Sequence, residues 1–437
     1  MYRLVHKLTA LLLFLGLVSG SLYAREPDRC KGKQIKAEVL SNRQRAGGSS
    51  SPYEFIPQSY TAAPQGYTPF YISHFGRHGS RYHTSAGTFS SLLKTLTEAA
   101  ENDLLTACGK DLLQRMESAS EITQRLSGDL SQVGTREHKE IAARMYSNFP
   151  EVFSTNGRTC RIYARATTSP RVILSMAAFS EALKEIDKSI EITREAGNET
   201  SSYLNHYTPE YKQYYSEGPW RQIRDEWAKK HIDPSRIINS LFKDASPVGG
   251  KADGSRARRF VQDLFSAAAI MPASGLPSLY DFFNDDEILV LWQAKNMDQY
   301  MQKGPSGIGH DLALDIARPL LKNFIDSAEA ALSGNGISAD LRFGHGEGLM
   351  PLAGLMGIEE AARVESNPDK MYIAWQDYKI TSMAGNIQWI FFTNGSNDIL
   401  VKILLNERES RIPVATDSWP YYHWKDIHNY YKTLLNL

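Results

Sequence analysis

A short apolar run is followed directly by a cluster of cationic side chains in the stretch Phe70-Tyr71-Ile72-Ser73-His74-Phe75-Gly76-Arg77-His78-Gly79-Ser80-Arg81. Its apolar half predicts a short buried β-strand that stops at Gly76. In an open α/β sheet, ligands bind in the crevice beyond the carboxyl ends of the strands. Guanidinium groups match phosphate oxygens, and a neutral imidazole between them is a competent nucleophile toward phosphorus. Gly79 would let the backbone approach an anion closely. We therefore expect a phosphate site directly after this strand.

A second strand end carries similar chemistry. Residues 160–164 predict a strand, and Ser169 with Pro170 predicts the N-cap and first position of a helix. Arg171 falls in the first turn of that helix, where free N–H groups already favour an anion. A cation there is unfavourable for the helix alone, which suggests that Arg171 serves a ligand. The alternative is a solvated arginine.

Residues 340–343 predict a third strand, which His345 and Glu347 follow closely. They could supply a cation and a proton donor, although His-x-Glu triplets are common. Three cationic strand ends in one sheet are a stronger signal than any one of them.

The rest of the chain predicts an α/β sheet domain interrupted by a mostly helical insert. Helical spacing recurs at 89–105, 112–126, 137–149 and 349–356, the last closed by Gly357, and residues 387–392 and 399–405 form a predicted β-hairpin around Asn394-Gly395. Residues 25–66 are polar and predict an extended, irregular segment. We assign residues 25–186 and 331–437 to the sheet domain and 187–330 to the insert, against which part of 87–150 could also pack.

Residues 1–24 have the pattern of a cleaved signal peptide, with Arg3 and Lys7 before an apolar stretch of signal-peptide length and small residues before Ala24. No second such run follows, so we expect a secreted or periplasmic protein without a membrane span. Removal of this segment leaves 47 basic against 49 acidic residues. That balance disfavours nucleic acid as a partner. The three cysteines, Cys30, Cys108 and Cys160, leave at least one thiol unpaired within the chain, and the pairing stays open.

Several segments together resemble one known family. Residues 77–81 resemble the RHGxRxP signature of the histidine phosphatase superfamily, in its acid phosphatase/phytase branch. Residues 345–347 resemble the His-Ala-Glu triplet of multiple inositol-polyphosphate phosphatases rather than the His-Asp pair of other phytases. Residues 126–150, 169–183, 343–358 and 401–407 also resemble segments of that family, so the likeness runs along most of the chain.

The resemblance implies a role for each matching residue. His78 is the nucleophile that forms a phosphohistidine, and Glu347 protonates the leaving oxygen and then activates water. The phosphoryl group is held by Arg77, Arg81, Arg171 and His345. Positioning and charge compensation are what phosphoryl transfer requires, so no metal or other cofactor is implied.

Two departures from the family pattern affect the expected pocket. His83 stands where the family has proline, and it either enters the specificity pocket or lies in a surface loop. Gly346 replaces alanine and would loosen the backbone before Glu347. Arg165 either reaches the substrate or holds a strand end. A metal site formed by His74, His78 and His83 is disfavoured by their spacing.

These residues predict an exported phosphomonoesterase that hydrolyses inositol polyphosphates, including the hexakisphosphate, and releases inorganic phosphate. One alternative is a broad-specificity acid phosphatase acting on sugar or nucleotide monophosphates. Another is a catalytically inactive phosphate-binding protein, which the combination of His78 and Glu347 disfavours. The tyrosine-rich segments 203–215 and 421–431 are interpreted as helix packing rather than a binding surface.

Overall fold

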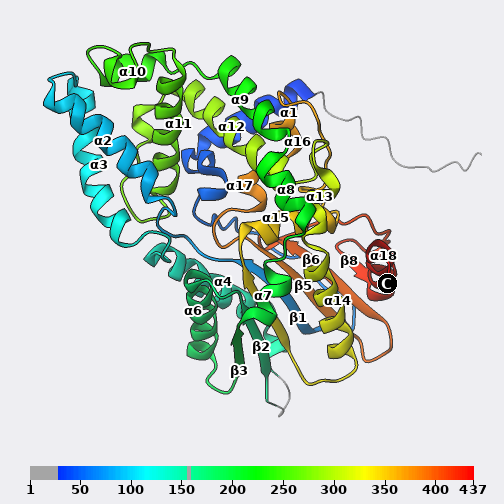
Figure 1. Cartoon of the computed structure of the whole chain (residues 1–437). Coiled ribbons are helices and arrows are strands. Elements are labelled where there is room, and N and C mark those ends of the chain that lie inside the picture. Colours follow the sequence, from blue (N-terminus) through cyan, green and yellow to red (C-terminus); the bar gives the residue numbers. More distant parts are fainter. Residues whose placement is uncertain (1–27, 155–158) are drawn as a thin grey trace, which may run out of the picture.

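The computed structural model describes residues 28–154 and 159–437, and these form one eight-stranded sheet flanked by helices (Figure 1). The strands are β1 (Thr68–Arg77), β2 (Arg161–Ala166), β3 (Glu191–Ala196), β4 (Ala339–Gly344), β5 (Asn386–Thr393), β6 (Ile399–Leu405), β7 (Arg408–Glu409) and β8 (Tyr421–His423). Their order is β3-β2-β4-β1-β5-β6-β7, with β8 also paired to β6. The predicted α/β class is confirmed, and so are the three predicted strands and the hairpin, as β1, β2, β4 and β5–β6.

Three parallel strands bring the predicted site residues to one edge of the sheet. β4 lies between β1 and β2 and pairs in parallel with both. In the register, Arg77 at the end of β1 faces Gly344, and Ala166 at the end of β2 faces Phe343. The segments that begin with His78, Thr167 and His345 therefore leave the sheet side by side.

Alternating apolar side chains give the sheet a separate core on each face. On one face, α4 (Gln132–Asn148) and α6 (Pro170–Ile186) cover Ile72, Leu341 and Phe343. On the other face, α14 (Arg318–Leu332), α15 (Gly346–Leu355) and α18 (Trp424–Leu435) share a core with Tyr71 and Trp389. Figure 1 shows α4 and α6 on the opposite side of the strands from α14 and α18.

A largely helical region lies beyond the strand ends and includes α2 (Ala86–Glu101) and α3 (Ala107–Arg125) (Figure 1). Its other elements include α8 (Pro209–Glu217), α9 (Trp220–His231), α10 (Ser235–Leu241), η2 (Ser246–Val248), α11 (Ser255–Ile270), η3 (Tyr280–Phe282), α12 (Asp285–Lys303) and α13 (His310–Asp315). Shorter helices are α5 (Pro150–Phe153), α7 (Asn198–Leu204), α16 (Met371–Ala374) and α17 (Asp377–Ile380). The insert bounds 187–330 stay a prediction. β3 extends the sheet beyond residue 187, and α2 and α3 pack on α11 and α10.

The expectation of an irregular segment over residues 25–66 is wrong for its first half. Residues 28–50 form α1 (Asp28–Ser41) and η1 (Arg43–Ser50), and the buried pair Ile35 and Val39 gives α1 a core-facing side. The four-residue spacing of Ile35 and Val39 is typical of a helix, but the surrounding Gly/Ser/Lys-rich composition is typical of an irregular segment and masks it.

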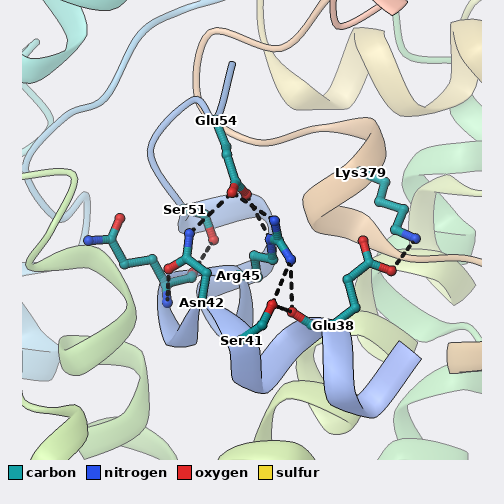
Figure 2. A network of polar contacts seen from close by, with 8 residues as sticks. Glu38, Ser41, Asn42, Arg45, Ser51, Glu54 and Lys379 are labelled. Atoms are coloured by element: carbon teal, nitrogen blue, oxygen red, sulfur yellow. Dashed lines mark hydrogen bonds and ion pairs between the residues drawn. The ribbon is translucent and has the colours of Figure 1, made fainter. Parts of the chain in front are cut away.

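Figure 2 shows a polar network that fastens this N-terminal segment. Arg45 donates two hydrogen bonds of 2.8 Å to Glu54 and a third, of 2.9 Å, to the Glu38 carbonyl. The Glu38 carboxylate accepts from Lys379 at 2.7 Å. These contacts fix η1 against the residues around α17, which matters because η1 reaches the predicted site.

The predicted signal peptide lies outside the described residues. Within residues 28–154 and 159–437, no helix combines the length and apolar character needed to cross a bilayer. All three cysteines are free, with Cys30 and Cys108 exposed and Cys160 buried.

Candidate active site

Arg77, the last residue of β1, is held by segments from both ends of the chain. Its side chain is buried, and Nη1 donates to the carbonyls of Ser49 and Thr381, each at 2.5 Å. Ser49 belongs to η1, and its own N–H donates to the Asp377 carboxylate at 3.0 Å. Arg77 Nε is left without a partner among the described residues. The guanidinium group is therefore fixed in place through Nη1 while Nε stays available to a ligand.

The loop after Arg77 is positioned by a close backbone approach to α4. A methyl group on Gly79 would lie 2.5 Å from the Gly134 carbonyl oxygen, so packing against α4 requires this glycine. The expectation that Gly79 also lets the backbone approach an anion stays a prediction. Ser80 adds two hydrogen bonds to Glu137, 2.7 Å from its N–H and 2.6 Å from its hydroxyl.

His78 is oriented for attack through one ring nitrogen. Its Nδ1 lies 2.9 Å from the Gly79 carbonyl oxygen, which only accepts, so Nδ1 carries the proton and Nε2 keeps a lone pair. Burial lowers the pKa of His78 well below its usual range, and the nearby charges of Arg77, Arg81 and Arg171 lower it further. The imidazole is therefore neutral and nucleophilic at physiological pH.

Three guanidinium groups surround His78 with unused donors. The Nε atoms of Arg77, Arg81 and Arg171 are all buried and have no hydrogen-bond partner among the described residues. Burial lowers the pKa of Arg77 to about 10 and that of Arg81 to about 9, so both stay charged at neutral pH. Buried cations with unused donors are costly unless an anion binds. The arrangement is suited to a phosphate group.

Arg171 lies in the first turn of α6, as predicted. Ser169 is the N-cap residue and Pro170 the first helical residue, but the Ser169 side chain makes no capping hydrogen bond. The N–H groups of Val172 and Ile173 donate to the Ser169 carbonyl at 2.9 and 3.1 Å. Because Pro170 has no N–H, the Arg171 N–H is the first-turn donor that an anion could use.

His345 and Glu347 lie at the N-terminus of α15 beside the arginines. The rings of His345 and His78 are 5.6 Å apart, and His345 Nε2 is 3.2 Å from the Thr167 hydroxyl. Burial lowers the pKa of His345 to about 4. Gly346 does more than loosen the backbone, because an alanine methyl here would lie only 3.2 Å from Arg77 Nε.

Glu347 is ionised in the ligand-free protein. Its Oε1 accepts from Lys303 Nζ at 3.0 Å, and the Lys303 charge is the largest cause that lowers the pKa of Glu347 well below its usual range. Arg77 and His345 act in the same direction. A bound phosphate dianion would offset these cations, so it would raise the pKa of Glu347 and prepare it to carry a proton.

Two lysines of α12, Lys295 and Lys303, lie near the predicted site residues, and the sequence did not single them out. Lys303 is the last residue of α12 and is almost fully buried. Lys295 makes no ion pair within 4.0 Å with the described residues, and burial lowers its pKa to about 8, with a further lowering from Arg81. No sequence signal marked them, because lysines on a helix usually lie in solvent.

His83 lies on the Arg81 side of the site. Burial lowers its pKa to about 4, and the charges of Arg81 and Lys295 lower it further. Its Nδ1 lies 2.9 Å from both the N–H and the carbonyl oxygen of Ser85, and these two contacts fit opposite neutral tautomers of the ring. This placement favours the pocket interpretation over the surface-loop one, although contact with substrate stays a prediction.

Arg165 and His74 have structural partners. Arg165 forms a buried ion pair with Asp340 of β4 and stacks over Tyr163, which favours its structural interpretation, and its substrate role stays a prediction. His74 packs 5.4 Å from the rings of both Phe179 and Phe343. Among the described residues, no three His, Cys, Asp or Glu side chains are grouped to hold a metal ion.

The Lys303–Glu347 pair predicts a pH effect. Replacing Lys303 with Met removes the main cause that keeps Glu347 ionised, so its pKa should rise. Proton donation requires the protonated form, and the rate is lost as the pH rises through that pKa. We expect the alkaline limb of kcat on an alkyl phosphate to move up by about one pH unit or more.

The matched control for this experiment is Lys295→Met, which removes a buried lysine of the same helix next to Arg81. It should change KM and leave the alkaline limb in place, and Lys303→Arg should resemble the wild type. An alkaline limb that stays unmoved in Lys303→Met would show that Lys303 does not control Glu347.

Known proteins share this fold and part of the sequence. Multiple inositol polyphosphate phosphatase 1 of Homo sapiens is 22% identical over 332 residues, which cover 71% of this chain and 67% of the relative. The multiple inositol polyphosphate phosphatase of Bifidobacterium longum, crystallised with phosphate, superposes with a TM-score of 0.75 at 19% identity, covering 90% of this chain and 97% of that one. The phytase from D. castellii gives a TM-score of 0.68 at 15% identity, covering 91% and 86%.

A family model described as "Histidine phosphatase superfamily (branch 2)" matches residues 75–406. The matched range is most of the chain and contains His78, the three arginines and Glu347. The chain therefore belongs to branch 2 of the histidine phosphatase superfamily.

Proposed function

We propose that this hydrolase removes phosphate from inositol polyphosphates, including inositol hexakisphosphate, through a covalent phosphohistidine at His78. The observation that carries the proposal is the set of three guanidinium groups, each with a buried and unpartnered Nε, around a neutral imidazole. Such a site binds a phosphoryl group and compensates its charge in the transition state.

The first step forms the phosphoenzyme. His78 Nε2 attacks phosphorus while Arg77, Arg81 and Arg171 hold the phosphoryl oxygens and Nδ1–H stays bonded to the Gly79 carbonyl. The bond from phosphorus to the inositol oxygen breaks, and protonated Glu347 gives its proton to that oxygen. The products of this step are the free hydroxyl and a phosphohistidine.

The second step returns the enzyme to its starting state. The Glu347 carboxylate accepts a proton from a water molecule as the water oxygen attacks phosphorus. The P–N bond breaks, its electron pair returns to His78 Nε2, and inorganic phosphate leaves. This order uses the ionised Glu347 that the Lys303 contact stabilises.

Two observations favour inositol polyphosphates over simple monoesters. Lys295 and His83 are close enough to Arg81 for its charge to lower the pKa of each, and both could meet a second phosphate of the same substrate. In addition, one structurally similar protein, from Bifidobacterium longum, is a multiple inositol polyphosphate phosphatase crystallised with inositol hexasulfate. A broad-specificity acid phosphatase would use the same catalytic groups but would not need Lys295 and His83 to bind a second phosphate.

The test compares kcat/KM for inositol hexakisphosphate with that for glucose 6-phosphate and a nucleoside monophosphate, before and after exhaustive EDTA dialysis. We expect the inositol substrate to be preferred by ~10-fold or more, since one charged contact contributes about that much. EDTA should leave activity intact because arginines compensate the charge. Equal kcat/KM values would support the alternative, and loss of activity that Mg²⁺ or Zn²⁺ restores would contradict the mechanism.

We also propose that the protein is exported, on the basis of residues 1–24. Mass spectrometry of the secreted or periplasmic fraction should find a mature N-terminus at Arg25. An intact Met1 in the cytoplasmic fraction alone would contradict this proposal.

A further inference from the structure

A cavity of about 360 Å³ adjoins the Glu347 side of the active site. Its lining residues are Tyr207, Tyr211, Lys212, Tyr215, Lys303 and Glu347. The volume falls within the range of small-molecule sites, roughly 300–1,000 Å³. Because Glu347 is the proposed donor to the leaving oxygen, a group entering this cavity is the leaving group.

Three tyrosines form one wall of the cavity. Residues 207, 211 and 215 recur every four positions and so lie on one side of α8 and the residue stretch that precedes it. The rings of Tyr207 and Tyr211 are stacked at 5.8 Å, and those of Tyr211 and Tyr215 are 6.3 Å apart. Figure 1 shows α8 beside α13 and α15. The interpretation of residues 203–215 as helix packing holds for Tyr214, whose hydroxyl donates to the Met301 carbonyl at 2.6 Å, and for Tyr211, which lies in the hydrophobic core. Tyr207 packs against that core and also lines the cavity, and Tyr215 lines it while 46% exposed.

The Tyr211 hydroxyl is an unused polar group at this wall. Tyr211 is 2% exposed, and its hydroxyl has no hydrogen-bond partner among the described residues. Burial is the main cause that raises the pKa of Tyr211, and the nearby Tyr207 and Glu347 side chains raise it further. A buried hydroxyl of this kind ordinarily has a partner. A ligand hydroxyl would provide one.

The cavity is mainly aromatic and offers a second phosphate little unpaired charge. Lys303 is already paired with Glu347, and the further charge of the lining, Lys212, lies exposed. The aromatic faces of the wall carry negative potential. By contrast, Lys295 and His83 gather next to Arg81. The leaving group is therefore expected to contact aromatic side chains near Glu347 and cationic side chains near Arg81.

We propose that Tyr207, Tyr211 and Tyr215 form a subsite for the ring of the leaving alcohol. The ring packs its C–H or aromatic face on the tyrosines, and the Tyr211 hydroxyl bonds a ring hydroxyl. This inference rests on the proposed phosphatase activity and specifies the substrates as monoesters of ring alcohols. Any further phosphates of the substrate lie on the Arg81 side.

The test uses monoesters that differ in the ring alone. The wild type and the variants Tyr207→Ala, Tyr215→Ala and Tyr211→Phe are assayed with myo-inositol 2-phosphate, cyclohexyl phosphate and the acyclic glycerol 2-phosphate, all esters of secondary alcohols. Each alanine variant should lower kcat/KM on both ring esters by about two- to tenfold and leave glycerol 2-phosphate within about twofold. Tyr211→Phe should lower kcat/KM on the inositol ester and spare the cyclohexyl ester.

The control is Tyr430→Ala, which removes a partly buried tyrosine of α18 and should change none of the three rates. Tyr215 is 46% exposed, so its alanine variant carries little folding risk. Equal losses on ring and acyclic esters, or no loss on any, would overturn the subsite and leave the phosphatase proposal standing. A wild type that hydrolyses none of the three esters and no inositol polyphosphate would overturn both.

Discussion

Replacing His78 with Ala should abolish turnover while the arginines still bind the substrate. In the proposed mechanism the His78 imidazole supplies the electron pair that attacks phosphorus. We expect kcat to fall by ~10⁴-fold or more, the scale seen when a catalytic nucleophile is removed. Calorimetry with inositol hexakisphosphate should give a dissociation constant within about tenfold of that of the wild type in the absence of turnover.

His423→Ala is the control for this prediction, because His423 lies on β8 and pairs with Asp398. It should keep full activity. More than trace activity in His78→Ala would mean that water attacks phosphorus directly, and the role assigned to His78 would be wrong.

Replacing Glu347 with Gln should affect substrates according to their leaving groups. An inositol alkoxide needs a proton as the P–O bond breaks, whereas nitrophenolate leaves without one. Glutamine keeps the size and accepts a hydrogen bond from Lys303, but it has no proton to give. We expect single-turnover phosphorylation by inositol hexakisphosphate to slow by ~10²–10⁴-fold. Phosphorylation by 4-nitrophenyl phosphate should slow much less.

Single-turnover conditions are required, because in the proposed mechanism Glu347 also activates the water of the second step. Equal losses for the two substrates would show that Glu347 acts through binding or structure. The donor would then be sought first at His83, whose ring lies close enough to Arg81 for that charge to lower its pKa.

The parts of the fold that the sequence predicted are those with a strong local signal. The apolar run ending at Gly76, the Ser169-Pro170 helix start and the Asn394-Gly395 turn each predicted an observed element. The β3 edge strand was missed because Glu191, Thr193, Arg194 and Glu195 give it almost no apolar character. α1 was missed because the surrounding polar composition masked a single buried face.

The same distinction holds for the site. His78, Arg77 and Arg81 share one short segment, and Arg171, His345 and Glu347 follow predicted strand ends, so topology alone places them together. Lys303 and the Ser49 carbonyl come from α12 and η1, and only the tertiary fold brings them to Glu347 and Arg77. The contact between His78 Nδ1 and the Gly79 carbonyl is local, but the side-chain orientation that produces it could not be predicted from the sequence pattern.

The central claim is the covalent intermediate at His78, and the Glu347→Gln variant allows the most direct test. With 4-nitrophenyl phosphate this variant should still phosphorylate His78 but lack the base that activates water. After rapid quenching in base, ³²P-labelled substrate should leave about one phosphate per chain, acid-labile and mapped to His78 by peptide analysis. Steady release of nitrophenolate without bound label, or label on another residue, would contradict the account.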